Sequence, residues 1–296
     1  MSGQFSIAPL DRLLKARAKV GAVVVPGDRA CPESLPRCLE PTSAGPSDLP
    51  VIGPDLDHNI IQLAWRRGIP VWEVGSLSDA STLELIAALQ PELIVVACFP
   101  HIFPVALLQL PRYGCLNLHP SLLPAYRGPA PLFWLARQNE RHTGVTLHQI
   151  DEGLDTGDIV AQVSFDRPEG ISEAGLEQRC AELGADLLLS AVEQLKYGSL
   201  DRFSQAEVGA SYFPWPSASD LVIPTRWPAQ RAFNFLRGAE NWPLIIQIGD
   251  TQFRIRVAIS YAVDQLLEQP YLLLGDELWV QFEPGVLRAK IWAGSA

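Results

Sequence analysis

This chain of 296 residues lacks the patterns that mark a membrane protein, a dinucleotide site or a metal centre. No apolar run reaches the length that spans a bilayer, and Asp11 and Arg12 interrupt the apolar core that a signal peptide would need. No Gly-x-Gly-x-x-Gly occurs, so nothing indicates a bound dinucleotide. Asp151, Asp155 and Asp158 do not follow the register of a calcium loop, and we expect no metal.

Positive charge is also scarce. Lys and Arg number 23 against 33 Asp and Glu, the net charge is −10 and the pI is about 5.0. A broad nucleic-acid footprint normally needs a basic face, so this balance disfavours one, although it is compatible with a local basic patch. We expect neither DNA nor a membrane as a partner. Hydrophobic residues make up 48% and charged residues 19%, which indicates a packed protein of one large or two ordinary domains.

Closely spaced cysteine pairs are the next absence. The five cysteines form no Cys-x-x-Cys, and three of them fall in predicted strand or helix interiors, where a reduced thiol behaves as a small hydrophobic group. Free cysteines are typical of a reducing compartment, so the sequence predicts a cytoplasmic protein. The cysteines are Cys31, Cys38, Cys98, Cys115 and Cys180.

The most informative residues that are present are an amide and an imidazole. Asn117 and His119 lie two apart at the end of an apolar run, and in a strand that spacing places both side chains on one face. Asp155, further along the chain, could set the charge of the imidazole. An amide, an imidazole and a carboxylate together suit acyl transfer, in which an oxyanion is held and a proton is moved.

The first half of the sequence alternates short apolar runs with helical patterns, which indicates a parallel α/β sheet with covered faces. Asp57 is a possible N-cap of the first predicted helix after a proline-rich loop at 26–54. The pattern predicts strands at 20–25, 70–74, 93–97 and 115–119, and helices at 57–67, 80–89 and 130–138.

The second half predicts a different organisation. Two strands flank the aspartate, a long amphipathic helix follows, and a segment with little periodicity leads to a run of short strands that could close as a small β-barrel. The predicted strands are 145–150, 158–165, 244–248, 252–259, 271–274, 277–282 and 286–291, and the helices are 172–195 and 228–237. We therefore expect a first domain at 1–196, a linker at 197–222 and a barrel domain at 223–296.

Four sequence blocks carry a family resemblance. They are Gly114 to Pro124, Tyr126-Arg127-Gly128, Thr143 to Thr146 and Asp151 to Ile159. These blocks resemble the 10-formyltetrahydrofolate-dependent formyltransferases, and the likeness is strong over about residues 90 to 165. Within the family the chain is most similar to the members that formylate methionyl-tRNA. The resemblance implies a Rossmann-like catalytic domain followed by an OB-like β-barrel.

The resemblance also implies roles for the polar trio. Asn117 and a protonated His119 would donate hydrogen bonds to the oxyanion that forms when an amine attacks the formyl carbon. Asp155 would lie near His119, raise its pKa and hold a water that carries the amine proton to N10 of the folate. His148 could face the same site, but we favour a structural role for it in the preceding strand.

The formyl donor implied by the family is 10-formyltetrahydrofolate, held mainly by backbone groups of two loops and a turn. Pro100 has no N–H, so His101 and Phe103 are the better backbone partners in the first loop. The turn after the histidine would form the floor of the site. The predicted cofactor-binding residues are Phe99, His101, Ile102, Phe103, Ser121, Leu122, Leu123, Pro124, Ile150, Asp151, Glu152 and Leu154.

The amine acceptor stays open at this point. Initiator methionyl-tRNA, a small amine such as a nucleotide-linked amino sugar, and a non-catalytic binding role all fit the scaffold, and formyl release to water is a further possibility. Charge argues against tRNA, because the segment 26–54 carries a net −2 and the region from Gln205 onward holds seven basic and nine acidic residues. We expect scattered rather than clustered arginines at Arg226, Arg231, Arg237, Arg254 and Arg256.

The N-terminal end raises a separate expectation. Relatives begin with an apolar strand ahead of the segment that matches Met1 to Ala8, and Phe5 to Leu10 would start the first helix. A doubly wound sheet without that central strand would expose two strand edges. We favour a start codon assigned too late over a genuine rearrangement, in which case adding upstream residues should improve solubility and activity.

Overall fold

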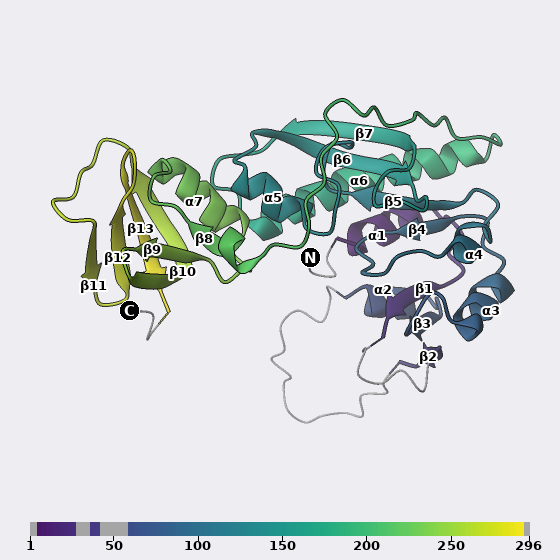
Figure 1. The fold of residues 1–296 in the computed structure, drawn as a ribbon. Helices are drawn as coiled ribbons and strands as arrows, with labels where there is room; N and C mark the ends of the chain where they lie inside the picture. The colour runs from purple at the N-terminus through teal and green to yellow at the C-terminus, as the bar shows by residue number, and fades with distance from the viewer. Residues whose placement is uncertain (1–4, 28–35, 42–58, 293–296) are drawn as a thin grey trace, which may run out of the picture. The chain divides into compact units, whose positions relative to one another are not determined.

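The computed structural model describes residues 5–27, 36–41 and 59–292. The helices are α1 (Ile7–Lys15), α2 (Ile60–Arg66), α3 (Ala80–Ala88), α4 (Val105–Leu108), α5 (Pro131–Arg137), α6 (Glu173–Leu195), a 3-10 helix (Ala218–Leu221) and α7 (Ala229–Gly238) (Figure 1). The strands are β1 (Val23–Pro26), β2 (Arg37–Leu39), β3 (Val71–Val74), β4 (Ile94–Val96), β5 (Cys115–His119), β6 (His142–Gln149), β7 (Ile159–Asp166), β8 (Val222–Ile223), β9 (Ile245–Ile248), β10 (Thr251–Ala262), β11 (Tyr271–Leu274), β12 (Glu277–Gln281) and β13 (Val286–Ile291).

The chain forms two compact units. The first comprises Met1–Arg127, Gly144–Val163 and Gln178–Ser211, and the second comprises Gly128–Thr143, Ser164–Glu177 and Tyr212–Ala296. The residues with catalytic potential at the ends of β5 and β6 belong to the first unit. The last six strands belong to the second.

The predicted parallel sheet is present as two separate sheets with mixed directions. One has the order β1-β3-β2, with β1 parallel and β2 antiparallel to β3. The other has the order β4-β5-β6-β7, with β4 parallel and β6 antiparallel to β5. Among the strands that the structure describes, none pairs with the outer edge of β1 or of β4. The strands from which a parallel sheet was predicted do pair in parallel, β1 with β3 and β4 with β5. The strands β2 and β6 add antiparallel partners that the prediction of a parallel sheet did not include.

Strand β2 corrects a second prediction, since its sequence was assigned to a long loop. Leu39 packs against the core cluster that contains Val71 of β3, and the indole nitrogen of Trp65 donates to the Leu39 carbonyl at 3.0 Å. Arg37 pairs with Glu73 across the same two strands. These non-local contacts stabilise a short strand that its own sequence pattern does not reveal.

Helix α2 begins later than the sequence pattern suggests. The side chain of Asn59 accepts a hydrogen bond from the backbone N–H of Ile61 at 2.9 Å, so Asn59 is the N-cap. The earlier candidate, Asp57, lies outside the described residues. The other predicted helices and strands agree with the structure to within a few residues at each end.

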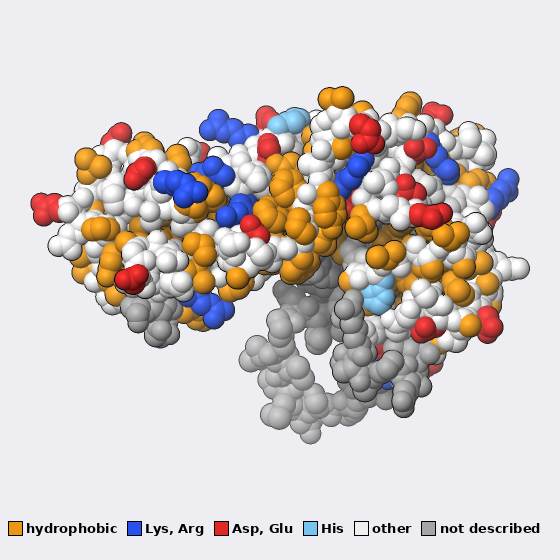
Figure 2. All heavy atoms as spheres, viewed as in Figure 1, with side chains coloured by type: hydrophobic (Ala, Val, Ile, Leu, Met, Phe, Trp, Pro, Cys, Tyr) orange, Lys and Arg blue, Asp and Glu red, His pale blue; other side chains and the backbone are white. Residues whose placement is uncertain are grey.

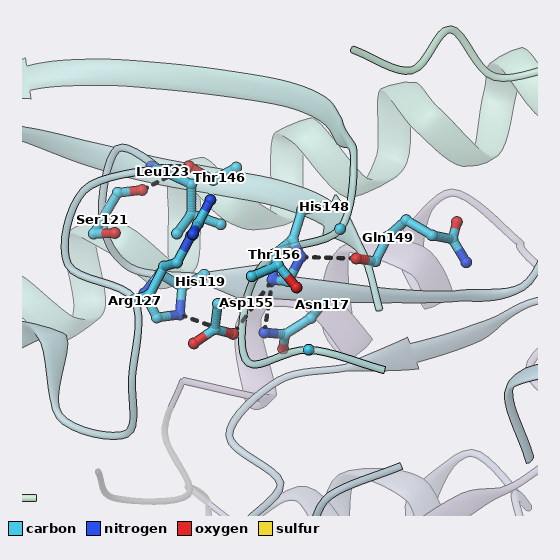
Figure 3. Close-up of polar contacts among 12 residues, drawn as sticks. Asn117, His119, Ser121, Leu123, Arg127, Thr146, His148, Gln149, Asp155 and Thr156 are labelled. Carbon is cyan, nitrogen blue, oxygen red and sulfur yellow. Dashed lines mark hydrogen bonds and ion pairs between the residues drawn. The ribbon is translucent and has the colours of Figure 1, made fainter. Parts of the chain in front are cut away.

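The long helix α6 covers the sheet that carries the polar trio. Gly184 allows a close approach, because a Cβ at this position would lie 3.2 Å from Leu118 of β5 and 3.3 Å from Val145 of β6. Leu118, Val145 and Leu188 are all buried. This packing fixes β5 and β6 relative to each other, and their polar side chains point away from the helix toward the loops in Figure 3.

The strands of the second unit form one six-stranded sheet in the order β11-β12-β13-β10-β9-β8. The long strand β10 has two register irregularities against β13, which bend it as expected for a small curved sheet or barrel. Phe253 of β10, Leu278 of β12 and Leu287 of β13 are fully buried. Helix α7 packs on β10 through its apolar side, which includes Phe235.

Helix hydrophobicity and surface charge bear on what the protein could contact. In the ranges that the structure covers, no helix is both long and apolar enough to cross a membrane. On the face drawn in Figure 2, Lys and Arg side chains occur in small groups interspersed with acidic ones. The visible face therefore has no extended surface of one sign.

Candidate active site

Strand β5 delivers two polar side chains to one end of the sheet. Asn117 is partly exposed, whereas the side chain of His119 is only 5% exposed. Both follow Cys115, whose burial raises the pKa of its thiol to about 12 and leaves it unreactive. Figure 3 shows Asn117 and His119 on the same side of the strand, facing Asp155. The structure thus brings the predicted trio together.

The tautomer of His119 is set by the chain that follows it. Nε2 lies 2.8 Å from the Tyr126 carbonyl oxygen, which can only accept, so Nε2 carries a proton. Nδ1 is then the nitrogen that remains for chemistry, and it lies 3.7 Å from Oδ1 of Asp155. A small molecule seated between Asn117 and Asp155 would therefore meet Nδ1.

The surroundings of His119 act on its pKa in opposing directions. Burial lowers the pKa of His119, and this effect exceeds the opposing influence of the Asp155 carboxylate, which raises it. His148 lowers the pKa further, and the bond to Tyr126 raises it. We predicted a protonated histidine, whereas the lowered pKa favours a neutral ring with a lone pair on Nδ1 in the resting protein. The expected influence of Asp155 is present but is not the largest one.

His148 belongs to the site, although sequence reasoning favoured a structural role. It is the direct cross-strand partner of Asn117 in the β5–β6 register. Its Nδ1 lies 2.9 Å from the Gln149 carbonyl and must donate to it, so Nε2 accepts from the Asn117 amide at 3.1 Å. One amide hydrogen of Asn117 is thereby fixed, and the other is left for a substrate. Sequence reasoning missed this role because it depends on the register between β5 and β6, which cannot be predicted from the sequence of either strand alone.

The predicted floor of the site is a turn held by a bond of its own and by bonds from β6 and β7. Ser121 is fully buried and donates through Oγ to the Ala125 carbonyl at 2.7 Å. The hydroxyl of Thr146 donates to the Ser121 carbonyl at 2.7 Å and accepts from the Leu123 N–H at 3.1 Å. Gln162 adds bonds to the Leu123 carbonyl and to Thr146. These polar groups shape the turn, and a direct role of Ser121 to Pro124 in binding folate stays a prediction.

The loop that carries the aspartate is built differently. The Asp151 carboxylate accepts from the Gly153 N–H at 3.1 Å and from the Thr156 hydroxyl at 2.8 Å. Gly157 lies so close to β6 that a Cβ there would be 2.0 Å from the Gln149 carbonyl oxygen. Asp155 itself has φ of 55°, in the left-handed region. Asp155 thus reaches the site through a tight turn that few other residue types would adopt.

The remaining predicted cofactor residues are placed but untested. Phe99 and Phe103 pack against the buried cluster around Leu107, so their side chains belong to the core. Ile102 and Leu154 are 74% and 50% exposed, which is unusual for large apolar residues. Ile150 uses its N–H on the Cys115 carbonyl, and Asp151 and Glu152 are exposed. Their contribution to folate binding stays a prediction.

Comparison with known proteins adds independent findings. Residues 54–192 match the family described as formyl transferase. The chain is 36% identical over 242 residues to the methionyl-tRNA formyltransferase of Citrifermentans bemidjiense. The aligned region covers 81% of this chain and 70% of that protein. It is 33% identical over 241 residues to the enzyme of the same name from Caldanaerobacter subterraneus. This alignment covers 81% of this chain and 72% of that protein.

The fold has a relative among solved structures as well. An N-formyltransferase from Helicobacter canadensis, solved with folinic acid and dTDP-3-aminofucose, superposes with a TM-score of 0.62. The two sequences are 17% identical, and the match covers 98% of this chain and 97% of the other. At this identity the similarity establishes the shared fold.

Proposed function

The chain belongs to the formyl transferase family, and from that membership we propose that it moves a formyl group from 10-formyltetrahydrofolate to the amine of initiator methionyl-tRNA in the cytoplasm. The observation that carries the proposal is the convergence of Asn117, His119 and Asp155 at one end of β5. Identities of 36% and 33% to methionyl-tRNA formyltransferases, each over 81% of the chain, favour this acceptor.

The lowered pKa of His119 indicates where the first proton goes. As the amine attacks the formyl carbon, a C–N bond forms and the nitrogen becomes acidic. Nδ1 of His119 accepts that proton, and the nearby Asp155 carboxylate stabilises the resulting imidazolium. The imidazolium then returns the proton to N10 of the folate as the bond from N10 to the formyl carbon breaks. The formyl group ends on the acceptor amine, and tetrahydrofolate leaves.

The oxyanion of the tetrahedral intermediate needs a donor that is in place before reaction. The free amide hydrogen of Asn117 meets this need, because its other hydrogen is already committed to His148. The protonated form of His119 provides a second, charge-assisted donor once it has taken the amine proton. Both donors lie on the face of the sheet opposite to α6, on a strand fixed by core packing.

Surface charge bears on the tRNA as acceptor. Arg254 and Arg256 are exposed two residues apart on one face of β10. On neighbouring strands Arg288 already pairs with Glu277 at 2.8 Å and Lys290 with Asp276 at 3.3 Å. Two arginines on one strand are a small phosphate-binding element and not a broad footprint. The proposal therefore implies modest tRNA affinity with a shallow dependence on salt.

A small amine is the second candidate acceptor, and the net charge of −10 favours it. A protein that binds an amino sugar on a nucleotide needs only a few phosphate contacts, whereas a tRNA offers many. The Helicobacter canadensis protein was solved with such a molecule, dTDP-3-aminofucose. This second reading keeps the same donor and the same catalytic trio.

One panel of assays tests both candidates. Tetrahydrofolate release from 10-formyltetrahydrofolate is measured with initiator methionyl-tRNA, with a nucleotide-linked amino sugar, and with no amine. Turnover that depends on the tRNA supports the proposal, and turnover with the amino sugar alone replaces it with the second candidate. Equal release in all three reactions would identify a folate hydrolase and overturn both.

A salt titration of acceptor binding sharpens the result. If tRNA binds through Arg254 and Arg256, Arg254→Ala with Arg256→Ala should reduce the slope of log affinity against log salt by about 2. Binding of an amino sugar should be unaffected by the same double variant. An unchanged slope for tRNA would show that these arginines do not contact its phosphates.

A further inference from the structure

The segment Phe203–Ser211, which we call the strap, contacts both loops of the site. At one end, Phe203 and Ile159 exchange two backbone hydrogen bonds at 2.8 and 2.9 Å. At the other end, Ser211 receives bonds from the Tyr126 N–H through its hydroxyl and from the Arg127 N–H through its carbonyl. The Ser211 N–H donates to the Pro124 carbonyl at 3.1 Å. The strap therefore ties down the turn whose Tyr126 carbonyl sets the His119 tautomer.

Gln205 in the middle of the strap holds the second loop. Its amide nitrogen donates to the Asp155 carbonyl at 2.8 Å and to the Gly157 carbonyl at 2.7 Å. Its amide oxygen accepts from Nε and Nη2 of Arg127 at 3.1 and 2.8 Å. Both hydrogens and the oxygen of this one side chain are therefore used, which fixes the amide orientation.

The two carbonyls held by Gln205 belong to Asp155 itself and to Gly157, two residues further along the chain. A non-glycine residue with φ of 55° persists where its surroundings hold it. The Asp151 carboxylate stabilises the loop from within, because it accepts hydrogen bonds from Gly153 and Thr156 of the same loop. Gln205, by contrast, lies 50 residues further along the chain than Asp155 and donates a hydrogen bond to the backbone carbonyl of Asp155 itself.

We propose that Gln205 is a positioning residue that holds the Asp155 carboxylate in register with His119, and that Arg127 orients Gln205 for this task. The inference rests on the proposed formyl transfer, because only that reaction uses the pair. It adds a residue outside the four sequence blocks that carry the family resemblance. Gln205 makes no direct contact with the reacting atoms in this account and acts through Asp155.

The groups that face His119 make the proposal measurable. They are the Asp155 carboxylate from the aspartate loop, the His148 ring from β6 and the Tyr126 carbonyl from the turn. Asp155 is the one carboxylate among them, so its withdrawal should lower the pKa of His119. A merely structural strap would leave that pKa unchanged.

The test replaces Gln205 with methionine, which has similar length but neither donates to the carbonyls nor pairs with Arg127. The ring protons of the five histidines are followed by NMR as pH is varied, with His119 assigned from a His119→Asn spectrum. We expect Gln205→Met to lower the pKa of His119 by roughly 1 unit. In the formyl transfer assay, kcat should fall roughly 10-fold to 100-fold with little change in KM for the folate.

The matched control is Gln178→Met on α6, because Gln178 also donates to a side chain, that of Glu182, but on an exposed helix face. It should leave both the His119 pKa and kcat at wild-type values. If Gln205→Met leaves the His119 pKa and kcat unchanged, or lowers only the melting temperature, the proposal is overturned. Should Gln205→Met fail to fold, Gln205→Asn, which keeps the amide but is one methylene shorter, is judged by the same criteria.

The NMR titration also separates this proposal from the function on which it rests. It requires no substrate, so a lowered His119 pKa in Gln205→Met supports the positioning role even if neither acceptor is formylated. Conversely, tRNA formylation by wild-type protein together with an unchanged pKa would retain the function and reject the role of Gln205.

Discussion

The two loops that meet at the site differ in how much of their shape is set by the sheet. The turn after β5 is largely shielded from solvent, and Thr146 and Gln162 of the sheet bond its first part, whereas Ser211 of the strap bonds its second part. The aspartate loop is largely exposed and depends on its own Asp151 and on Gln205 from a distant segment. The turn that sets the imidazole tautomer is thus bonded to the sheet as well as to Ser211 of the strap, whereas the carboxylate loop is bonded to Asp151 and to Gln205 of the strap.

This difference suggests a division of tasks. The oxyanion donors must be in place before the substrate arrives, and a strand with a packed turn provides that. The aspartate loop lies at the surface, where a large acceptor must approach. A loop held by a few replaceable bonds is suited to small adjustments during binding. The predictions below test whether the turn controls stability while the loop controls rate.

The largest effect should come from Asp155→Asn. Asparagine tolerates the left-handed backbone, so the fold should be retained while the carboxylate is lost. We expect a loss of about 2.7–4 kcal/mol of transition-state stabilisation, or about 10² to 10³ in kcat, with folate affinity nearly unchanged. Steady-state kinetics and a folate binding titration check this. A variant that retains more than half of wild-type turnover would exclude the role assigned to Asp155.

The same variant gives a signed pH effect. Burial lowers the pKa of His119 from its ordinary value of 6.5, so the acid limb of kcat should lie below that value. Asp155 raises the pKa, and Asp155→Asn should therefore move the acid limb to still lower pH. The same lowered pKa also determines how the free energy of unfolding changes with pH. Stability is complete above about 6.5 and falls as pH decreases toward the lowered pKa, because only the unfolded state binds the proton in that window.

The largest effect on stability should come from Thr146→Val in the turn. Removal of the hydroxyl leaves the buried Ser121 carbonyl and Leu123 N–H without their partner. We expect a loss of about 1–3 kcal/mol in the free energy of unfolding, measured by urea denaturation. The residual activity of folded protein should be near that of the wild type. A stable but inactive variant would reverse the assignment of tasks.

The sequence predicted much of this arrangement, but not its cross-strand part. Asn117, His119 and Asp155 follow from spacing, apolar runs and the family resemblance, and β5 has the predicted bounds. The role of His148 depends on its register opposite Asn117, and register arises from pairing of two segments. The lowered pKa of His119 depends on burial by residues distant in sequence. Gln205 lay in a segment without periodicity, where a pattern gives no information on contacts.

A moderate effect is expected at His148, which connects β6 with the oxyanion donor. His148→Phe keeps a ring in the strand but removes the acceptor that orients Asn117. The loss of one hydrogen bond corresponds to about 1 kcal/mol, or about fivefold in kcat. Asn117→Ala measured alone and together with His148→Phe provides the control. If the two effects add fully, His148 does not act through Asn117.

The smallest effect is expected from Thr156→Val, the counterpart of Thr146→Val in the exposed loop. Its hydroxyl bonds to the Asp151 carboxylate, which water can also satisfy. We expect at most about 0.5 kcal/mol in the free energy of unfolding, by the same urea measurement. A loss as large as that of Thr146→Val would show that the two loops are stabilised in the same way.

The left-handed backbone at Asp155 has a consequence for engineering this protein. Glycine and asparagine relieve the conformational cost of that turn, and neither can raise the pKa of His119. A laboratory selection for thermal stability alone would therefore accumulate Asp155→Gly and Asp155→Asn, and these variants would lose catalytic activity. Selections at this codon need an activity screen in parallel, because heat resistance and turnover are expected to trade off there.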